Sequence, residues 1–103
     1  MNISRKAALQ IMEKYPDRVP IKVVTNDHMD LQRTKFLVPL NLTLGNFLTV
    51  IRKYLVSVED YEALYIFIGG KLYPNTSTIS RIWEDQQSDY YLLAIIAKEN
   101  TFG

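Results

Sequence analysis

The run of residues 90–97 constrains the fold most, because it is almost unbroken in apolar side chains. A strand with one solvent-exposed face alternates apolar and polar residues, whereas a strand buried on both faces is continuously apolar. We therefore expect residues 90–97 to lie in the middle of a sheet. A second apolar run, residues 63–68, is followed by Gly69-Gly70 and the segment 71–73. This pattern predicts another central strand, a turn and a short hairpin partner.

Three helices and two further strands follow from spacing and capping residues. Ser4 is the expected N-cap of a helix that reaches about Lys14, and a brief helix is predicted over residues 78–85. Thr43 is the expected cap of the middle helix, whose apolar residues recur at three- and four-residue spacing as Leu44, Phe47, Val50, Ile51 and Leu55. Strands are predicted over 19–24 and 36–38, joined by a polar loop that holds His28. Pro20 places the first strand near an edge or near its own start.

Strands at both ends of the chain around one long middle helix indicate an α+β fold of the β-grasp type, which ubiquitin-like proteins share. We expect a mixed four-stranded sheet, the middle helix and a short N-terminal helical extension. The 103 residues suit a single domain, 1–103. Within it, we expect residues 1–15 to form the extension and residues 98–103 a flexible C-terminal tail, whose final glycine suits conjugation because it has no Cβ.

The composition argues against several classes of function. Twelve Lys and Arg against eleven Asp and Glu leave a net charge of +1, which does not favour nucleic acid. Without cysteine there is no disulfide, thiolate metal site or cysteine nucleophile, and one histidine with no phosphate-binding loop makes an enzyme, a metal or a cofactor unexpected. No apolar stretch approaches the roughly 20 residues that span a bilayer, and the N-terminus is unlike a signal peptide, so we expect a cytoplasmic protein.

Several motifs occur in an order that resembles a known family. Residues 15–20 read Tyr-Pro-Asp-Arg-Val-Pro, residues 35–39 read Lys-Phe-Leu-Val-Pro, and residues 51–53 read Ile-Arg-Lys. The chain ends in Glu-Asn-Thr-Phe-Gly. These segments resemble the autophagic ubiquitin-like modifiers, the family of GABA-receptor-associated protein and microtubule-associated protein light chain, and the resemblance covers about Ala8 to Gly103.

The resemblance implies that Gly103 is the site of lipid conjugation. The implied partners are the activating and conjugating enzymes of autophagy, a deconjugating cysteine protease and phosphatidylethanolamine. The implied location is the cytoplasm, and the autophagosome membrane after lipidation. Two alternatives stay open: the other autophagic ubiquitin-like modifier, which is joined to a protein lysine, and a β-grasp scaffold that binds peptides without being conjugated.

The resemblance also implies a site for cargo receptors that carry an aromatic residue and, three positions later, an aliphatic one. Matching positions give an aromatic pocket of Ile11, Pro20, Lys35, Leu37 and Tyr91, with Lys35 as its gate. They give an aliphatic pocket of Phe36, Val38, Pro39, Leu42, Phe47 and Val50. Arg18 and Arg52 would contact acidic peptide residues. From their pattern alone, most of these apolar residues would be assigned to the core and these charges to the surface.

One residue departs from the family pattern within this site. Lys22 stands where the family generally has an aliphatic residue that faces the aromatic pocket. The departure predicts a shallower pocket or an altered preference for the peptide.

Overall fold

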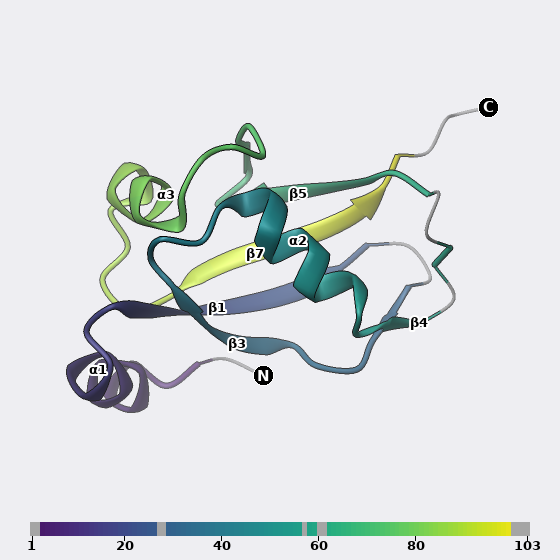
Figure 1. Cartoon of the computed structure of the whole chain (residues 1–103). Coiled ribbons are helices and arrows are strands. Elements are labelled where there is room, and N and C mark those ends of the chain that lie inside the picture. The colour runs from purple at the N-terminus through teal and green to yellow at the C-terminus, as the bar shows by residue number, and fades with distance from the viewer. Residues whose placement is uncertain (1–2, 27–28, 57, 60–61, 100–103) are drawn as a thin grey trace.

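The computed structural model describes residues 3–26, 29–56, 58–59 and 62–99. In chain order the elements are α1 (Arg5–Lys14), β1 (Arg18–Thr25), β2 (Asp30–Leu31), β3 (Lys35–Pro39), α2 (Leu44–Arg52), β4 (Leu55–Val56), β5 (Leu64–Ile68), β6 (Lys71–Leu72), α3 (Ile79–Gln86) and β7 (Leu92–Lys98). Figure 1 shows α2 lying across one face of the main sheet, with α1 and α3 near one end of it.

The main sheet has the strand order β3-β1-β7-β5-β6. β7 pairs in parallel with β1 and antiparallel with β5, so the strand predicted to be central is central and the sheet is mixed. The expected count of four strands was wrong, because Lys71 and Leu72 pair with β5 and add a short fifth strand. A separate two-stranded sheet joins β2 to β4.

The helices begin where the sequence predicts. The hydroxyl oxygens of Ser4, Thr43 and Thr78 each accept a hydrogen bond from the backbone N–H three residues later, which satisfies an otherwise unpaired donor of the first turn. The middle helix is shorter than expected. α2 ends at Arg52, and Leu55 belongs to β4 instead.

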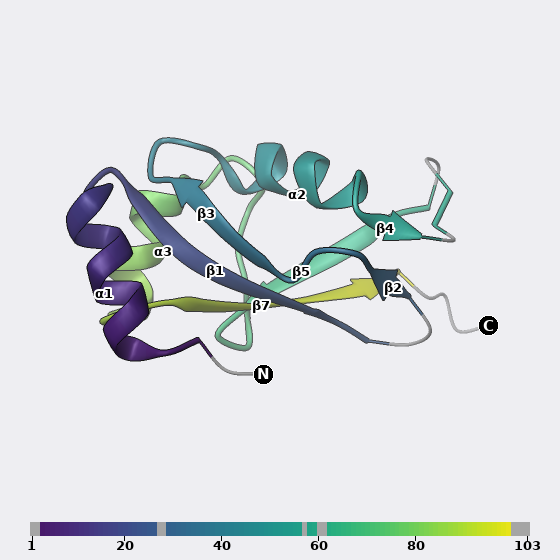
Figure 2. The same ribbon diagram turned by 90° about the horizontal axis from the view of Figure 1, so that it is seen from below.

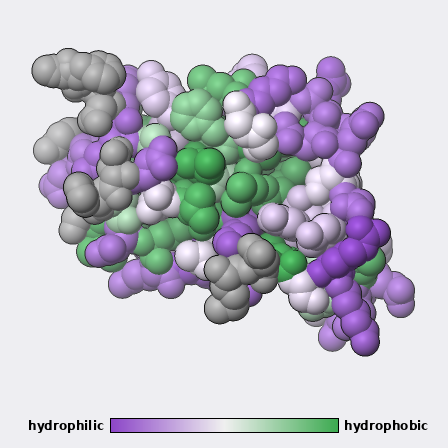
Figure 3. Space-filling view, turned by 180° about the vertical axis from the view of Figure 1, so that it is seen from behind, coloured by the Kyte–Doolittle hydropathy of each residue, from purple (hydrophilic) through white to green (hydrophobic). Residues whose placement is uncertain are grey.

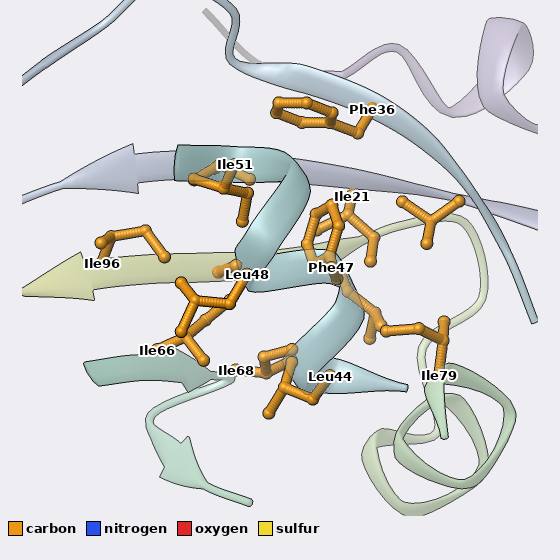
Figure 4. Close-up of a cluster of buried hydrophobic side chains, with 14 of the residues drawn as sticks. Ile21, Phe36, Leu44, Phe47, Leu48, Ile51, Ile66, Ile68, Ile79 and Ile96 are labelled. Atoms are coloured by element: carbon orange, nitrogen blue, oxygen red, sulfur yellow. The ribbon is translucent and has the colours of Figure 1, made fainter. Parts of the chain in front are cut away.

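The core lies between α2 and the sheet. Leu44, Phe47, Leu48 and Ile51 of α2 are buried and point toward side chains of the strands, as Figure 4 shows. The strand residues that meet them alternate along their strands, among them Ile21 of β1, Ile66 and Ile68 of β5 and Ile96 of β7. Ile79 and Ile82 of α3 extend the cluster.

The other face of the sheet is not covered by α2, as the edge-on view in Figure 2 shows. The pairing register places Val24, Ile95, Phe67 and Leu72 in one row across four strands of this face. Apolar side chains accordingly gather at the centre of the face in Figure 3, with hydrophilic residues around them. We call it the outer face.

Pro20 lies inside the sheet and not at its edge, because β1 has a neighbour on each side. The missing N–H is tolerated for two reasons. Pro20 stands opposite Leu37 in a pair that exchanges no hydrogen bonds, and pairing of β1 with β7 begins only at Ile21. The prediction that Pro20 lies near the start of its strand is confirmed.

Candidate functional site

The candidate site follows β3, which forms one edge of the main sheet. The N–H of Val23 donates to the carbonyl of Thr34 at 2.7 Å, and hydrogen-bonded pairs alternate in an antiparallel ladder. Phe36 and Val38 therefore direct their backbone groups toward β1, whereas Leu37 directs its amide and carbonyl away from the sheet. Within the described part of the chain no strand lies on that side of β3.

A hollow of about 360 Å³ lies between α1 and β3. Its lining comes from α1 and the two residues before it, from β1, and from β3 and the segment before it: Ile3, Ser4, Ala7, Ala8, Ile11, Pro20, Arg33, Lys35, Phe36 and Leu37. We call it the first hollow. Its walls are mostly apolar, and its cationic residues are Arg33 and Lys35. The described residues that line it include no carboxylate.

A second hollow of about 200 Å³ lies between β3 and α2. Its lining residues are Arg33, Phe36, Leu37, Val38, Pro39, Leu42, Phe47, Val50 and Tyr54. Three of them, Phe36, Val38 and Phe47, are also buried members of the core. The floor of the second hollow is therefore the outer wall of the core, which explains why their pattern alone predicts core positions.

The structure brings together most of the residues assigned to the two pockets by resemblance. Ile11, Pro20, Lys35 and Leu37 line the first hollow, and all six residues assigned to the aliphatic pocket line the second. Tyr91 does not line the first hollow. Its backbone N–H donates to the Ser88 hydroxyl at 3.3 Å, and its ring lies 4.9 Å from that of Tyr90, in the turn that precedes β7.

Sequence reasoning missed Arg33, which lines both hollows. Its Nε donates to the carbonyl of Lys35 at 3.1 Å, and its guanidinium lies 5.1 Å from the Phe36 ring centroid and 5.6 Å from that of Tyr54. Such cation–π contacts hold the planar group over the rings. Arg33 belongs to no apolar pattern, and only its position two residues before Lys35 could have indicated it.

The structure places the two predicted charge contacts outside both hollows. The Nη2 of Arg52 donates to the carbonyl of Glu62 at 2.6 Å and so ties the end of α2 to the segment before β5. Arg18 stands at the start of β1, opposite Pro39. The contacts of Arg18 and Arg52 with peptides stay predictions.

Contacts with the turn before β7 hold α1 in place as a wall of the first hollow. Arg5 pairs with Asp89, and its guanidinium lies 5.6 Å from the centroid of the Tyr90 ring. The only buried residue of α1 is Ala8, with 1% of its surface exposed. α1 is therefore attached by Ala8, by the partly buried Met12, which packs against the core, and by a few surface contacts.

The ionisable groups with shifted pKa values lie away from the hollows. The ammonium of Lys71 donates to Asp85 at 2.8 Å, which lowers the pKa of Asp85 and raises that of Lys71. The Tyr73 hydroxyl also bonds to Asp85, and burial together with this bond raises the pKa of Tyr73. Gln86 donates to Tyr73 and to the carbonyl of Ile68, so this network fixes the β5–β6 hairpin to α3.

No group of three or more His, Asp or Glu side chains in the described ranges could hold a metal ion. None of the described helices has both the length and the apolar character needed to cross a bilayer. Gly103, assigned to conjugation, and His28, assigned to a loop, lie outside the described residues.

The fold defines the class of protein: a mixed sheet wrapped around one helix is a ubiquitin-like β-grasp domain. The crystal structure of Trypanosoma brucei ATG8 has this fold with a TM-score of 0.83 and 32% sequence identity, over 96% of this chain and 88% of that one.

Sequence comparison assigns the family. Residues 4–103 match the family described as "Autophagy protein Atg8 ubiquitin like". Autophagy-related protein 8 of Schizosaccharomyces pombe is 41% identical over 91% of this chain and 80% of its own length, and that of Dictyostelium discoideum is 36% identical over 96% and 84%. The chain therefore belongs to the Atg8 family of autophagy proteins, which are ubiquitin-like modifiers and not catalysts.

Proposed function

We propose that this protein is an autophagy modifier that is conjugated through Gly103 to phosphatidylethanolamine and recruits cargo receptors along β3. The observation that carries the receptor half of the proposal is the outward-directed backbone of Leu37 between two apolar hollows. An extended peptide can add to such an edge, and because side chains alternate along a strand, two residues three positions apart project to opposite faces, one into each hollow.

The two hollows suit anchors of different size. The first, of about 360 Å³, has room for an aromatic side chain, and the second, of about 200 Å³, suits an aliphatic one. The carbonyl of Lys35 faces the same edge and accepts a hydrogen bond from Arg33. An incoming strand therefore competes with Arg33 for this carbonyl, and we propose Arg33 as a gate beside Lys35.

The conjugation half of the proposal rests on family membership and on the chemistry of glycine. A terminal glycine has no Cβ, so its carbonyl is open to attack and the extended tail fits a narrow enzyme channel. Activating and conjugating enzymes would pass Gly103 to the lipid amine, and a cysteine protease would reverse the linkage. Each buried CH₂ of the attached lipid adds about 0.8 kcal/mol of membrane affinity, which moves a cytoplasmic domain to the autophagosome membrane.

Conjugation is tested by intact mass after incubation with the activating and conjugating enzymes, ATP and vesicles that contain phosphatidylethanolamine. We expect the mass of one lipid to be added, and deletion of Gly103 to abolish the gain. Attachment to a protein lysine instead would support the alternative modifier. An absence of any adduct with enzymes that modify another Atg8 protein would leave only the peptide-binding scaffold.

Receptor binding is tested by titration with a peptide that carries an aromatic residue and, three positions later, an aliphatic one. Leu37 lines both hollows, so Leu37→Ala should weaken binding by about 1–2 kcal/mol, as buried interface anchors do. Leu72→Ala is the matched control, since Leu72 is an exposed leucine on the opposite edge strand. Equal affinity for the wild type and Leu37→Ala would contradict the β3 site.

A further inference from the structure

Glu62 joins three segments of the chain at the end of the sheet where β7 finishes. Its Oε1 accepts a hydrogen bond from the backbone N–H of Glu59 at 2.9 Å. Its Oε2 lies 3.4 Å from the ammonium nitrogen of Lys98, the last residue of β7. Its carbonyl accepts a hydrogen bond from Arg52, the last residue of α2. Glu62 therefore links the end of α2 and the segment before β5 to the end of β7.

The ion pair between Glu62 and Lys98 is partly buried. The two side chains are 26% and 31% exposed, whereas the side chains of the two other ion pairs among the described residues are at least 44% exposed. Salt and water screen a partly buried pair less than an exposed one. The hydrogen bond from Glu59, followed by the cations of Lys98 and Arg52, lowers the pKa of Glu62, so its carboxylate is ionised at neutral pH.

Lys98 is the last residue in the row of β7 side chains that faces α2. Leu92, Ala94 and Ile96 of this row are buried, and successive residues of a strand alternate between its faces. Figure 1 shows β7 ending beside the start of β5. The ion pair with Glu62 therefore lies at one end of the core, where the chain leaves the sheet.

The pairing of β7 with the chain before β5 continues one residue beyond Lys98. The N–H of Glu99 donates to the carbonyl of Ala63 at 2.9 Å, which is the final backbone hydrogen bond between these segments in the described part of the chain. The sequence places Gly103 four residues after Glu99. Separation of Lys98 and Glu99 from the sheet would add two residues to this segment and about 7 Å to its extended reach.

The length of the unpaired segment affects any enzyme that must bind Gly103 in an extended form. Binding orders the residues of the segment, and each ordered residue costs conformational entropy. A chain that is already paired as far as Glu99 loses less entropy on binding. The ion pair with Glu62 opposes the separation of Lys98 from the sheet.

We propose that the Glu62–Lys98 ion pair positions the C-terminal segment for carboxyl activation by keeping β7 paired as far as Glu99. The inference rests on the proposed function, because it takes Gly103 as the residue that the activating enzyme modifies. Glu62 and Lys98 are positioning residues, since they act through the segment that precedes Gly103. Loss of the pair should therefore weaken binding of the modifier to the enzyme and leave the reaction of the bound modifier unchanged.

The proposal is tested by ATP–pyrophosphate exchange with the activating enzyme at increasing concentrations of the full chain. In this reaction a carboxylate oxygen of Gly103 bonds to the α-phosphorus of ATP, and pyrophosphate leaves. Lys98→Met removes the charge and should raise KM about two- to fivefold, the range of one partly exposed ion pair, with kcat unchanged. Lys98→Arg keeps the cation and should keep KM near the wild-type value. Amide hydrogen exchange at Glu99 should be faster in Lys98→Met by a similar factor.

A double-mutant cycle separates positioning from a direct contact between Lys98 and the enzyme. Glu62→Gln removes the charge of the partner and keeps an oxygen that can accept the hydrogen bond from Glu59. If the two residues act as a pair, the double variant should raise KM no more than either single substitution. Effects that multiply would show that Lys98 acts on the enzyme by itself and would overturn the proposal.

Lys71→Met is the matched control, because it removes a lysine from the ion pair with Asp85, and β6 lies at an edge of the sheet, two strands from β7. It should leave KM unchanged. An equal rise of KM in Lys71→Met, or an unchanged KM in Lys98→Met, would overturn the positioning role and leave conjugation standing. Failure of the wild-type chain to support exchange, with an enzyme that activates another Atg8 protein, would overturn conjugation and the positioning role with it.

Discussion

Gly69 occupies a turn in which a side chain would collide with Gln86. Its φ is +59°, and a Cβ at this position would lie 1.8 Å from Gln86 Oε1. Gly69→Ala must therefore displace an amide that bonds to Ile68 and Tyr73, in addition to adopting a left-handed backbone. We expect a loss of about 2–3 kcal/mol in the free energy of unfolding, measured by urea titration.

Gly70 provides the control for that substitution. Its φ is +78°, but a Cβ there would meet no atom within 4 Å. Gly70→Ala should therefore lower the free energy of unfolding only by the cost of a left-handed backbone, about 1 kcal/mol. If both substitutions cost the same, the contact with Gln86 contributes nothing.

The ionisation of Asp85 makes the stability of the fold depend on pH. Its pKa is lowered by hydrogen bonds from Lys71 and Tyr73, so the ionised carboxylate is favoured in the folded state. Such a group stabilises the fold above its unfolded pKa, and this contribution is lost as pH falls through the lowered value. Asp85→Asn should therefore be less stable than the wild type at neutral pH. The two urea midpoints should begin to converge as pH falls below about 4, the ordinary pKa of aspartate, and should meet below the lowered value.

Single residues mark the limits of what the sequence can predict at the site. The apolar residues beside β3 were assigned through motifs, and the structure places Leu37, Val38 and Phe47 along the hollows. Arg33 could not be found in this way, because its role depends on rings that the fold brings beneath it. Tyr91 was assigned to the aromatic pocket but does not line the first hollow, since the turn at Ser88 directs its position and has no signature in the apolar pattern.

At the scale of elements, α1 should be separable from the rest of the fold. Its only buried residue is Ala8. Ala8→Glu would bury an unpaired carboxylate, so we expect α1 to detach while the sheet stays folded. Limited proteolysis should then cleave within residues 5–14, and the affinity for an aromatic peptide should fall because the first hollow loses a wall.

Gln10→Glu is the matched control for the detachment of α1. Gln10 is exposed on the same helix, so the substitution adds the same charge without burying it. It should change neither the cleavage pattern nor peptide affinity. Resistance of Ala8→Glu to protease would contradict the weak attachment of α1.

Elements with strong local signals were predictable, and elements held by tertiary contacts were not. The N-caps Ser4 and Thr43 follow from residue type followed by an apolar pattern. β2 and β4 are two residues each and have no periodicity to detect. Leu55 continues the helical spacing of α2, but it pairs with Leu31 and therefore belongs to β4.

At the scale of the molecule, we expect Phe47 to couple the stability of the fold to peptide recognition. It is 1% exposed, packs edge-to-face on Phe36 with ring centroids 5.5 Å apart, and lies beneath the second hollow. Phe47→Leu keeps much of the apolar volume and should cost about 1–1.5 kcal/mol of folding free energy. It should also weaken peptide binding by reshaping that floor.

Phe67→Leu is the control that separates a loss of folding free energy from a loss of peptide affinity. Phe67 is half-buried on the outer face, away from both hollows. Its replacement should lower the urea midpoint with unchanged peptide affinity. A loss of affinity in Phe67→Leu as large as in Phe47→Leu would indicate that binding follows global stability and not the shape of the second hollow.

The central strand and the covering helix were predictable because order and burial agree: the continuously apolar run 92–97 must be central, and one long helix must cover the sheet. The same arrangement has a consequence for synthesis on the ribosome. β3 and β1 meet β5 and β6 only through β7, which is translated last among the strands. At about 5–20 residues per second, β1 waits on the order of 3–13 s for its partner. The β5–β6 half-sheet is made only late in that interval, and until β7 is complete no strand joins it to the β1–β3 half-sheet, so chaperones have a defined time window in which to bind the nascent chain.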